Sequence, residues 1–398
     1  MNTPPLKALY FCEGFTDIRF VVGLADACEL TMATPAWEFR TSGLADRIRL
    51  SGARLRVDEI QGKRPAFQVN SLIYLLRHIH QFDVVVSQGM GRASLNSTIV
   101  GRLKGVPVVT YESVAAVEYW RCRRERGQIG PLKAIAGEAF LRTCMTVSGT
   151  LGTSAIGLGP YLKDLVGRYS SRPEMGYYYG VDTTLFTPVD DEKRNALRRR
   201  HGLPVDQFLA LFASRVSHEK DPETALLAVA KARAKGLNAV LLNLGGGFTD
   251  FLMLAHSLGI HDAEEWVIGR PAVHPMEDLC EYFQAADLVL QSSLEEGPGL
   301  SPLEALACRT PVVATNVGGL AAQLGGLAQL TPRRDVEAMT DAILWVSNNR
   351  AAAAAQAEKG RIFVESRWRS DRAFSELMKV LERVHLEANH NGRRAPSL

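Results

Sequence analysis

Two cations lie close together in the segment 214–222, where a helix is expected to begin. Asp221 is a favourable N-cap residue and Pro222 a favourable first helical residue, so the pattern predicts a helix from this point. Arg215 and Lys220 would then flank the partially positive helix N-terminus, which suits a phosphate and above all a pyrophosphate. Two exposed cations that contact only solvent are the alternative interpretation.

A second segment, 292–304, combines glycines with two carboxylates. The run Ser-Pro-Leu-Glu at 301–304 has the pattern of a capping box with proline at the first helical position, and it predicts a helix N-terminus whose spare amides face a ligand. Glu296 and Glu304 are suited to accept hydrogen bonds from sugar or ribose hydroxyl groups. The capping box alone also explains Glu304.

Both segments follow short apolar runs that we expect to be β-strands. Such runs alternate with helical patterns along the chain, which predicts βαβ units and parallel, doubly wound sheets. In open sheets of this kind, ligands bind beyond the carboxyl ends of the strands, where these two segments stand. The predicted strands are 6–11, 83–87, 106–111, 144–147, 208–213, 239–244, 266–268, 288–291 and 311–315.

The strands divide between two halves of the chain, and the turn-rich segment 180–188 marks the expected boundary. We predict an N-terminal Rossmann-like domain over residues 1–178 and a C-terminal one over 179–368. An amphipathic helix over 369–390 has apolar residues at i, i+3, i+4 and i+7 spacing, so it needs a surface to pack on. Residues 391–398 are expected to form a disordered tail.

Composition places the 398-residue chain among ordinary globular proteins. Hydrophobic residues make up 46% and charged residues 22%, which excludes a disordered, collagen-like or disulfide-scaffold chain. No apolar run approaches the roughly 20 residues that span a bilayer. The six cysteines are scattered without a C-x-x-C motif, which indicates reduced thiols in a cytoplasmic protein.

The first half of the chain is basic. Residues 1–180 contain 22 Lys and Arg against 15 Asp and Glu, whereas the remainder contains 24 against 28. This imbalance suggests an anionic surface or substrate near the first half. Its densest cluster is interpreted either as a solvated helical face or as a contact for acidic lipid headgroups or an anionic acceptor; it comprises Arg121, Arg123, Arg124, Arg126 and Lys133.

The sequence lacks the motifs of several other functions. There is no G-x-x-x-x-G-K-[ST] phosphate loop, no G-x-G-x-x-G fingerprint and no G-x-S-x-G nucleophile elbow. The nine histidines form no metal-binding pattern. We therefore expect no metal site and no cofactor, and nucleic-acid binding has no support beyond the arginine cluster.

The segment 296–320 closely resembles family 4 glycosyltransferases, whose pattern is E-x7-E, then E-A-x-A-x-G-x-P-V-V-A, then Gly-Gly-Leu. Arg215 and Lys220 match that family's R-x4-K motif, and 180–188 looks like its interdomain G-V-D-x3-F-x-P. The resemblance covers residues 176–320 well and residues 1–150 only weakly.

This resemblance implies an α/β chain of GT-B architecture, with two Rossmann-like, doubly wound domains facing each other across a cleft and a last helix that crosses back to the first domain. It implies a retaining, metal-independent transferase that uses a UDP- or GDP-type nucleotide-diphosphate sugar. The expected acceptor is a sugar or a lipid-linked molecule, as in surface polysaccharide or glycolipid assembly. The expected location is the cytoplasm, either free or in peripheral contact with an acidic membrane surface.

Carried over by position, the resemblance gives catalytic roles to Arg215, Lys220 and Glu296 and ribose binding to Glu304. The two cations would neutralise the departing nucleotide diphosphate, with most effect as negative charge accumulates on the leaving oxygen. Glu296 would contact the donor sugar. The remaining residues expected around the donor are Gly14, Gly297, Pro298, Gly299, Leu300 and Ser301.

The first domain departs from the family pattern. Gly14 stands alone where the family usually has two glycines, and Glu112 follows a strand where the family often has a histidine. Glu112 is predicted either to act at the reacting centre or to cap a helix. Two alternative functions therefore stay open: a non-catalytic nucleotide-sugar-binding subunit with a degenerate acceptor domain, or a nucleotide-sugar epimerase or hydrolase on the same fold.

Overall fold

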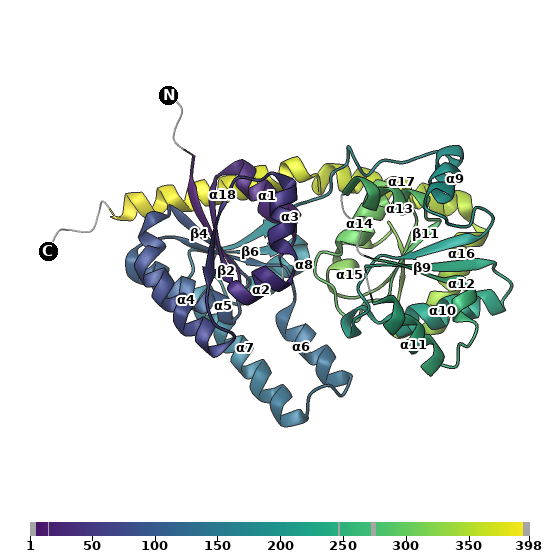
Figure 1. The fold of residues 1–398 in the computed structure, drawn as a ribbon, viewed down its shortest axis with the longest axis horizontal. Coiled ribbons are helices and arrows are strands. Elements are labelled where there is room, and N and C mark those ends of the chain that lie inside the picture. Colours follow the sequence, from purple (N-terminus) through teal and green to yellow (C-terminus); the bar gives the residue numbers. More distant parts are fainter. Residues whose placement is uncertain (1–4, 15, 246, 272–275, 393–398) are drawn as a thin grey trace. The chain divides into compact units, whose positions relative to one another are not determined.

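The computed structural model describes residues 5–392 except 15, 246 and 272–275. Within that part, the chain forms two compact units, each built on a parallel sheet flanked by helices (Figure 1). Unit 1 comprises Met1–Arg121, Gly130–Tyr179 and Asp371–Leu398, and unit 2 comprises Cys122–Ile129 and Gly180–Ser370. The predicted α/β class with two Rossmann-like sheets is confirmed.

Unit 1 contains a seven-stranded parallel sheet with the order β3-β2-β1-β4-β5-β6-β7. Its central strands are continuous apolar runs because helices cover both faces of a parallel sheet; Val84, Val85 and Val86 of β4 are fully buried. The strands are β1 (Lys7–Phe11), β2 (Glu29–Pro35), β3 (Arg56–Ile60), β4 (Val84–Gln88), β5 (Val108–Glu112), β6 (Ser154–Leu158) and β7 (Pro173–Gly176).

The helices of unit 1 carry recognisable end signals. For example, α5 (Arg92–Lys104) is followed by Gly105, which adopts the left-handed conformation that favours glycine after a helix. The helices that begin in this unit are α1 (Ile18–Ala27), α2 (Ala36–Thr41), α3 (Leu44–Ser51), α4 (Pro65–His78), η1 (Ile79–Gln81), α5 (Arg92–Lys104), α6 (Ala116–Glu125), α7 (Pro131–Leu151) and α8 (Gly159–Val166).

The strand predicted at 144–147 is wrong, because these residues lie inside α7. Its buried positions include Cys144, Met145, Ser148 and Gly149, a spacing that follows the helical period rather than the alternation of a strand. A run of only four residues does not distinguish the two periods. The strand at this place in the sheet is β6, a short segment that contains a glycine.

The last helix, α18 (Ser370–Gly392), packs on unit 1, as the fold prediction required. Phe374 stacks on Phe20 of α1, with 6.2 Å between ring centroids. A Cβ atom on Gly23 would come within 2.1 Å of the Phe374 ring, so glycine is what lets the helices approach. Of the predicted tail 391–398, the first two residues still belong to α18, and 393–398 lie outside the described residues.

Unit 2 contains a six-stranded parallel sheet with the order β10-β9-β8-β11-β12-β13. Its core includes Trp266 and the ring pair of Phe212 and Phe251, whose centroids are 5.7 Å apart. The strands are β8 (Phe208–Phe212), β9 (Ala239–Leu244), β10 (Val267–Arg270), β11 (Leu288–Gln291), β12 (Val312–Thr315) and β13 (Gln329–Thr331).

The unit 2 helices precede, separate and follow these strands. They are α9 (Asp191–Arg200), η2 (His218–Lys220), α10 (Pro222–Ala234), α11 (Phe248–Ser257), α12 (Ala263–Trp266), α13 (Met276–Ala285), α14 (Leu300–Ala307), α15 (Gly318–Leu324), α16 (Val336–Asn348) and α17 (Arg350–Arg367). Across both units, no helix of the described residues combines the length and apolar character that a membrane crossing needs.

Candidate functional site

The two cation- and carboxylate-bearing loops meet at the carboxyl ends of β8 and β11. These strands are neighbours at the point where the strand order of the sheet reverses, the usual place for a ligand in such a sheet. The Leu294 amide donates to the Glu219 carbonyl at 2.8 Å. The Ser292 hydroxyl lies 2.8 Å from the carbonyl oxygens of both Lys220 and Asp221. These bonds join the two loops into one site.

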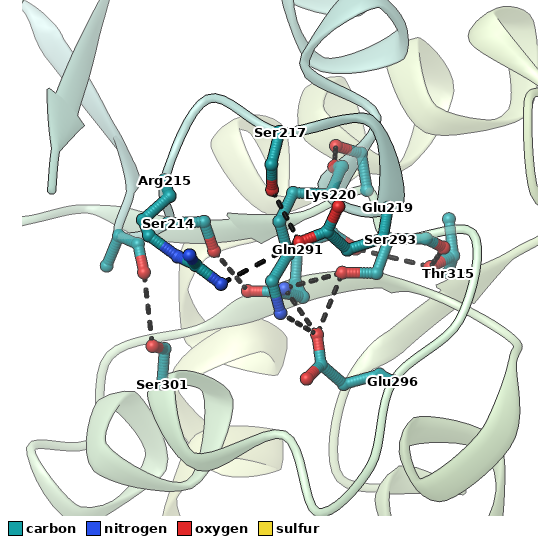
Figure 2. A network of polar contacts seen from close by, with 12 residues as sticks. Ser214, Arg215, Ser217, Glu219, Lys220, Gln291, Ser293, Glu296, Ser301 and Thr315 are labelled. Carbon is teal, nitrogen blue, oxygen red and sulfur yellow. Dashed lines mark hydrogen bonds and ion pairs between the residues drawn. The ribbon is translucent and has the colours of Figure 1, made fainter. Parts of the chain in front are cut away.

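Lys220 and Glu296 form the centre of this site. Lys220 Nζ donates to Glu296 Oε2 at 2.7 Å, and the two side chains are only 16% and 11% exposed. Gln291 Nε2 and Ser293 Oγ donate to the same oxygen at 2.9 Å each (Figure 2). Three donors therefore hold one carboxylate oxygen. The other, Oε1, receives no hydrogen bond from the described residues, so it is available to a ligand hydroxyl.

Gln291 and Ser293 are site residues that the sequence analysis missed. Gln291 Nε2 also donates to Ser293 Oγ at 2.7 Å, and Thr315 Oγ1 donates to the Ser293 carbonyl at 2.6 Å (Figure 2). A signal was present: β11 is a buried apolar strand that ends in glutamine and is followed by two buried serines. Buried polar groups need partners, so this cluster predicts a polar network.

Arg215 lies on the same loop as Lys220 but is placed differently. Its side chain is 73% exposed, and its guanidinium lies 3.8 Å from Glu219 Oε1. Within the described part of the chain, no hydrogen bond or ion pair joins it to Lys220 or Glu296. The structure therefore brings Lys220 and Glu296 together and leaves Arg215 as a surface cation on the same loop.

The helix predicted after Asp221 does begin at Pro222, but the predicted capping role of Asp221 is wrong. Asp221 has φ 47°, and its side chain bonds no helix amide. Its buried carboxylate instead accepts a hydrogen bond from the Thr224 hydroxyl at 2.6 Å and pairs with Arg126, which also pairs with Glu223 at 3.0 Å. Arg126, one arginine of the basic cluster, therefore forms ion pairs within unit 2.

The predicted capping box at 301–304 is also wrong. The helix α14 begins at Leu300, after Gly299 in the left-handed conformation, so Ser301 already lies in the first turn. The Ser301 hydroxyl donates instead to the Ala213 carbonyl at 3.2 Å, which adds a further bond between the two loops (Figure 2). Glu304 is buried on α14, with 4% of its surface exposed.

The backbone of the glycine-containing loop is supported by α15. The Gly319 amide donates to the Glu296 carbonyl at 3.0 Å, and Gln323 Nε2 donates to the Pro298 carbonyl at 2.9 Å. A Cβ atom at residue 319 would come 1.7 Å from the Gly297 carbonyl oxygen. The Gly-Gly-Leu motif is therefore a support for the loop that carries Glu296, a role not assigned from the sequence.

The two site residues predicted in the first half lie in unit 1. The Gly14 amide follows β1 and lies 3.4 Å from Gln88 Oε1. Glu112 is the last residue of β5; it is 3% exposed, and its Oε2 accepts the Met90 amide at 2.8 Å. Burial raises the pKa of the Glu112 carboxyl to about 7, while bonds from the amides of Met90 and Val114 lower it. Neither amide belongs to a helix, so Glu112 does not cap one.

Glu112 is expected to make stability depend on pH. Its carboxyl pKa rises from 4.5 to about 7 on folding, so between these values the folded chain binds more protons than the unfolded chain. This contribution is fully present below pH 4.5 and is lost as the pH rises through 7. Relative to the native chain, Glu112→Gln should therefore gain about 2 kcal/mol in the free energy of unfolding between about pH 5 and pH 8, measured by urea denaturation.

The matched control for this experiment is Glu29→Gln, an exposed glutamate at the start of β2. It should change the free energy of unfolding by the same small amount at both pH values. A Glu112→Gln variant whose pH profile runs parallel to that of the native chain would contradict the buried, proton-binding carboxyl described above.

The surroundings of Glu112 leave little free space. It lines a cavity of about 10 Å³, which has room for about one water molecule. Its place at a reacting centre stays a prediction.

A metal site is not evident in the part of the chain that the structure describes. No group of three His, Cys, Asp or Glu side chains is placed there to hold an ion.

Comparison with solved structures defines the class of fold. HepE of Anabaena, crystallised in complex with UDP, superposes with a TM-score of 0.73 at 16% identity, over 95% of this chain and 100% of that one. WaaG, a glycosyltransferase involved in lipopolysaccharide biosynthesis, superposes with a TM-score of 0.68 at 15% identity, over 94% and 99%. The chain has the two-domain, Rossmann-like GT-B fold.

Sequence comparison relates part of the chain to a known family. Residues 193–363 match the family model of the glycosyl transferases group 1. D-inositol 3-phosphate glycosyltransferase 1 of Catenulispora acidiphila is 34% identical over 260 residues, which cover 62% of this chain and 59% of that protein. The match thus spans less than two thirds of the relative's length. Residues 193–363 are therefore similar to the glycosyl transferases group 1, which confirms the resemblance that the motifs predicted for this part of the chain.

Proposed function

We propose that the protein is a retaining glycosyltransferase that takes a sugar from a nucleotide-diphosphate sugar and transfers it to an acceptor without a metal ion. The Lys220–Glu296 pair supports this proposal most strongly. It places a cation that can bind a diphosphate beside a fixed carboxylate that can accept a hydrogen bond from a sugar hydroxyl. Both lie where the strand order of the unit 2 sheet reverses. Both requirements of a nucleotide-sugar donor are met within one site.

The proposed mechanism depends on charge. As the bond between sugar and diphosphate breaks, negative charge accumulates on the leaving oxygen, and a cation already in place stabilises that charge more than it stabilises the bound substrate. Lys220 supplies this cation from a partly buried position, and the exposed guanidinium of Arg215 supplies a second. Two cations on one loop can take over the neutralisation that a divalent ion provides in other transferases.

The carboxylates and the loop backbone would hold the rest of the donor. Glu296 Oε2 is fixed by three donors, so Oε1 can accept a hydrogen bond from a sugar hydroxyl at a defined position. The backbone from Gly297 to Ser301 would surround the sugar and the phosphates. Glu304 would hold the ribose hydroxyls, and the donor-binding role of Gly14 stays a prediction from the family resemblance.

The donor is proposed to be of the UDP or GDP type, and the acceptor a sugar or lipid-linked molecule. UDP is the nucleotide in the HepE complex, and the relative from Catenulispora acidiphila is named for an inositol phosphate. We further propose a cytoplasmic location, with peripheral contact to an acidic membrane surface. The surplus of Lys and Arg in residues 1–180 supports that contact.

Ligand-dependent stabilisation tests the proposal. Each of UDP, GDP, ADP and their sugar conjugates is added to the protein, and the shift of the unfolding temperature is measured. A ligand at about 100 times its dissociation constant should add about 2.7 kcal/mol to the free energy of unfolding. Stabilisation by one nucleotide class supports a nucleotide-sugar enzyme and identifies its base. No stabilisation by any of them contradicts the proposal.

A turnover assay then distinguishes the reaction. The donor is incubated with and without a cell extract that supplies acceptors, and the fate of the sugar is followed by radiolabel. Transfer that requires the extract supports a glycosyltransferase. Free sugar or an epimerised donor formed without extract would instead indicate a hydrolase or an epimerase, and binding without turnover would indicate a non-catalytic subunit.

A further inference from the structure

A short segment from the first half of the chain, Cys122–Ile129, belongs to unit 2. The side chain of its residue Arg126 is only 16% exposed. One terminal guanidinium nitrogen donates to the Asp221 carboxylate, and the other donates to Glu223 Oε2 at 3.0 Å. Asp221 directly follows Lys220, so the segment is attached to the loop that carries the partly buried cation of the site.

The carboxylate of Asp221 depends on this arginine. Its side chain is 1% exposed, and among the described residues Arg126 is the only cation that pairs with it. The Thr224 hydroxyl, which donates to the other carboxylate oxygen at 2.6 Å, is neutral. A buried charge without a partner of opposite charge is costly, so the ion pair holds the Asp221 side chain in place.

The backbone of Asp221 in turn sets the position of Lys220. Asp221 has φ 47° and ψ 58°, a left-handed conformation that residues other than glycine keep only where their surroundings hold it. The Ser292 hydroxyl lies 2.8 Å from the carbonyl oxygens of both Lys220 and Asp221, and the Lys220 amide donates to the Ser217 carbonyl at 3.0 Å. A change of the backbone at Asp221 would therefore move the residue before it.

The same segment also borders the loop that follows β11. Burial raises the pKa of the Cys122 thiol to about 11, and the charges of Glu125 and Glu295 contribute to this rise. Glu295 lies in the loop after β11, so its charge reaches the segment. Glu125 also pairs with Arg333, which follows β13, at 3.2 Å. The attachment of the segment to unit 2 thus involves more than one ion pair.

We propose that Arg126 is a positioning residue of the donor site. Through Asp221 it fixes the backbone at Lys220, so that the Lys220 ammonium group stays where it can bind a diphosphate. Arg126 itself does not bind the donor, because its guanidinium is occupied by two carboxylates. The inference rests on the proposed function of Lys220. It predicts that the effect of Arg126 on nucleotide binding depends on Lys220, which a purely structural role would not require.

A double-mutant cycle tests this dependence. The binding of UDP and of GDP is measured by calorimetric titration of the full chain in four forms: native, Arg126→Ala, Lys220→Ala and the double variant. We expect Arg126→Ala to weaken binding of the tighter nucleotide about tenfold in the native background. In the Lys220→Ala background the same change should weaken it less than about twofold, because the contribution of Lys220 is already lost. Equal losses in both backgrounds would overturn the proposal.

A matched control and a second variant protect this test from effects on folding. Arg121→Ala breaks another arginine–glutamate pair of the basic cluster, the exposed one with Glu138 at 2.7 Å, and should leave nucleotide binding unchanged. Arg126→Ala leaves a buried charge without a cation, whereas Arg126→Ala/Asp221→Asn removes that charge as well. The double variant should be more stable in urea than Arg126→Ala and should keep the reduced affinity. Native affinity in this variant would contradict a positioning role.

Amide hydrogen exchange of the ligand-free protein separates this inference from the proposed function. Arg126→Ala should raise the exchange rates of residues 214–221 about tenfold, whereas Arg121→Ala should not change them. If the native chain binds nucleotide but Arg126→Ala alters neither exchange nor affinity, the positioning role fails and the proposed donor site stands. If exchange rises but the native chain binds neither UDP nor GDP, Arg126 holds the loop, and both the donor site and its part in donor binding are overturned.

Discussion

Lys220→Ala is expected to reduce sugar transfer about 100- to 1,000-fold, the effect of removing one fixed donor from a site where charge develops. Lys220 is the partly buried cation of the proposed donor site, and its Nζ lies 2.7 Å from Glu296. Its removal takes away both the charge for the diphosphate and one of the three donors that hold the carboxylate. Transfer of radiolabel from the donor to components of a cell extract measures the loss.

The control is Lys231→Ala on α10, where the lysine also pairs with a glutamate, Glu337, but at an exposed position. This variant should transfer sugar at the native rate. A Lys220→Ala variant with full activity would contradict the assignment of the donor site. Intermediate loss with a lower affinity for nucleotide alone would show that Lys220 acts on the bound substrate more than on the transition state.

A loss of activity in Lys220→Ala must also be separated from a loss of fold. Without Lys220, the largely buried carboxylate of Glu296 keeps only neutral donors, and an unpaired buried charge is costly. The double variant Lys220→Ala/Glu296→Gln removes that charge as well. It should regain stability relative to the single variant, as measured by urea denaturation, and should remain inactive.

Gly319→Ala should have the second large effect, on both stability and donor binding. The added methyl carbon would come 1.7 Å from the Gly297 carbonyl oxygen, so either α15 or the glycine-containing loop must move. Overpacking of this kind costs about 1–3 kcal/mol or more. The Gly319 amide also donates to the Glu296 carbonyl, so the shift should displace Glu296 and weaken nucleotide binding.

Gly325→Ala, at the end of the same helix, provides the comparison. Its added methyl carbon would meet no described atom within 4 Å, and its φ of −54° is normal for alanine. This variant should keep the native free energy of unfolding and the native affinity for nucleotide. Equal stability of the two variants would show that α15 does not support the loop as tightly as described.

The location of the site was predictable because its signals are local. A buried strand, then a polar loop, then a helix start repeats at β8 and at β11, and parallel strands bring such loops to one edge. The choice of Lys220 and Glu296 as site residues followed from their place on these two loops. The strand at 144–147 was not predictable in the same way, because a run of four residues fits a buried helix as well as a strand.

The partners of some site residues are not visible in their local sequence. Asp221 has the sequence context of a helix cap, yet its carboxylate bonds Arg126, which lies 95 positions away. Gln291 has an apolar context, yet it holds Glu296. For Asp221, a partner of opposite charge far along the chain replaces the expected cap, and no local pattern reveals that partner. The partner of Gln291 lies only five positions away, but an apolar strand does not indicate that its last residue will bond a carboxylate.

The return of α18 to unit 1 has a consequence for synthesis on the ribosome. Phe374 covers Phe20 and fits against Gly23, but the whole of Gly180–Ser370 is translated between these contacts. At a translation rate of about 5–20 residues per second, synthesis of this segment takes roughly 10–40 s, and during that time the aromatic surface of unit 1 is not covered by α18. Unit 2 is complete first, although its main segment is translated after most of unit 1. The nascent chain therefore exposes an apolar patch that chaperones recognise until α18 emerges.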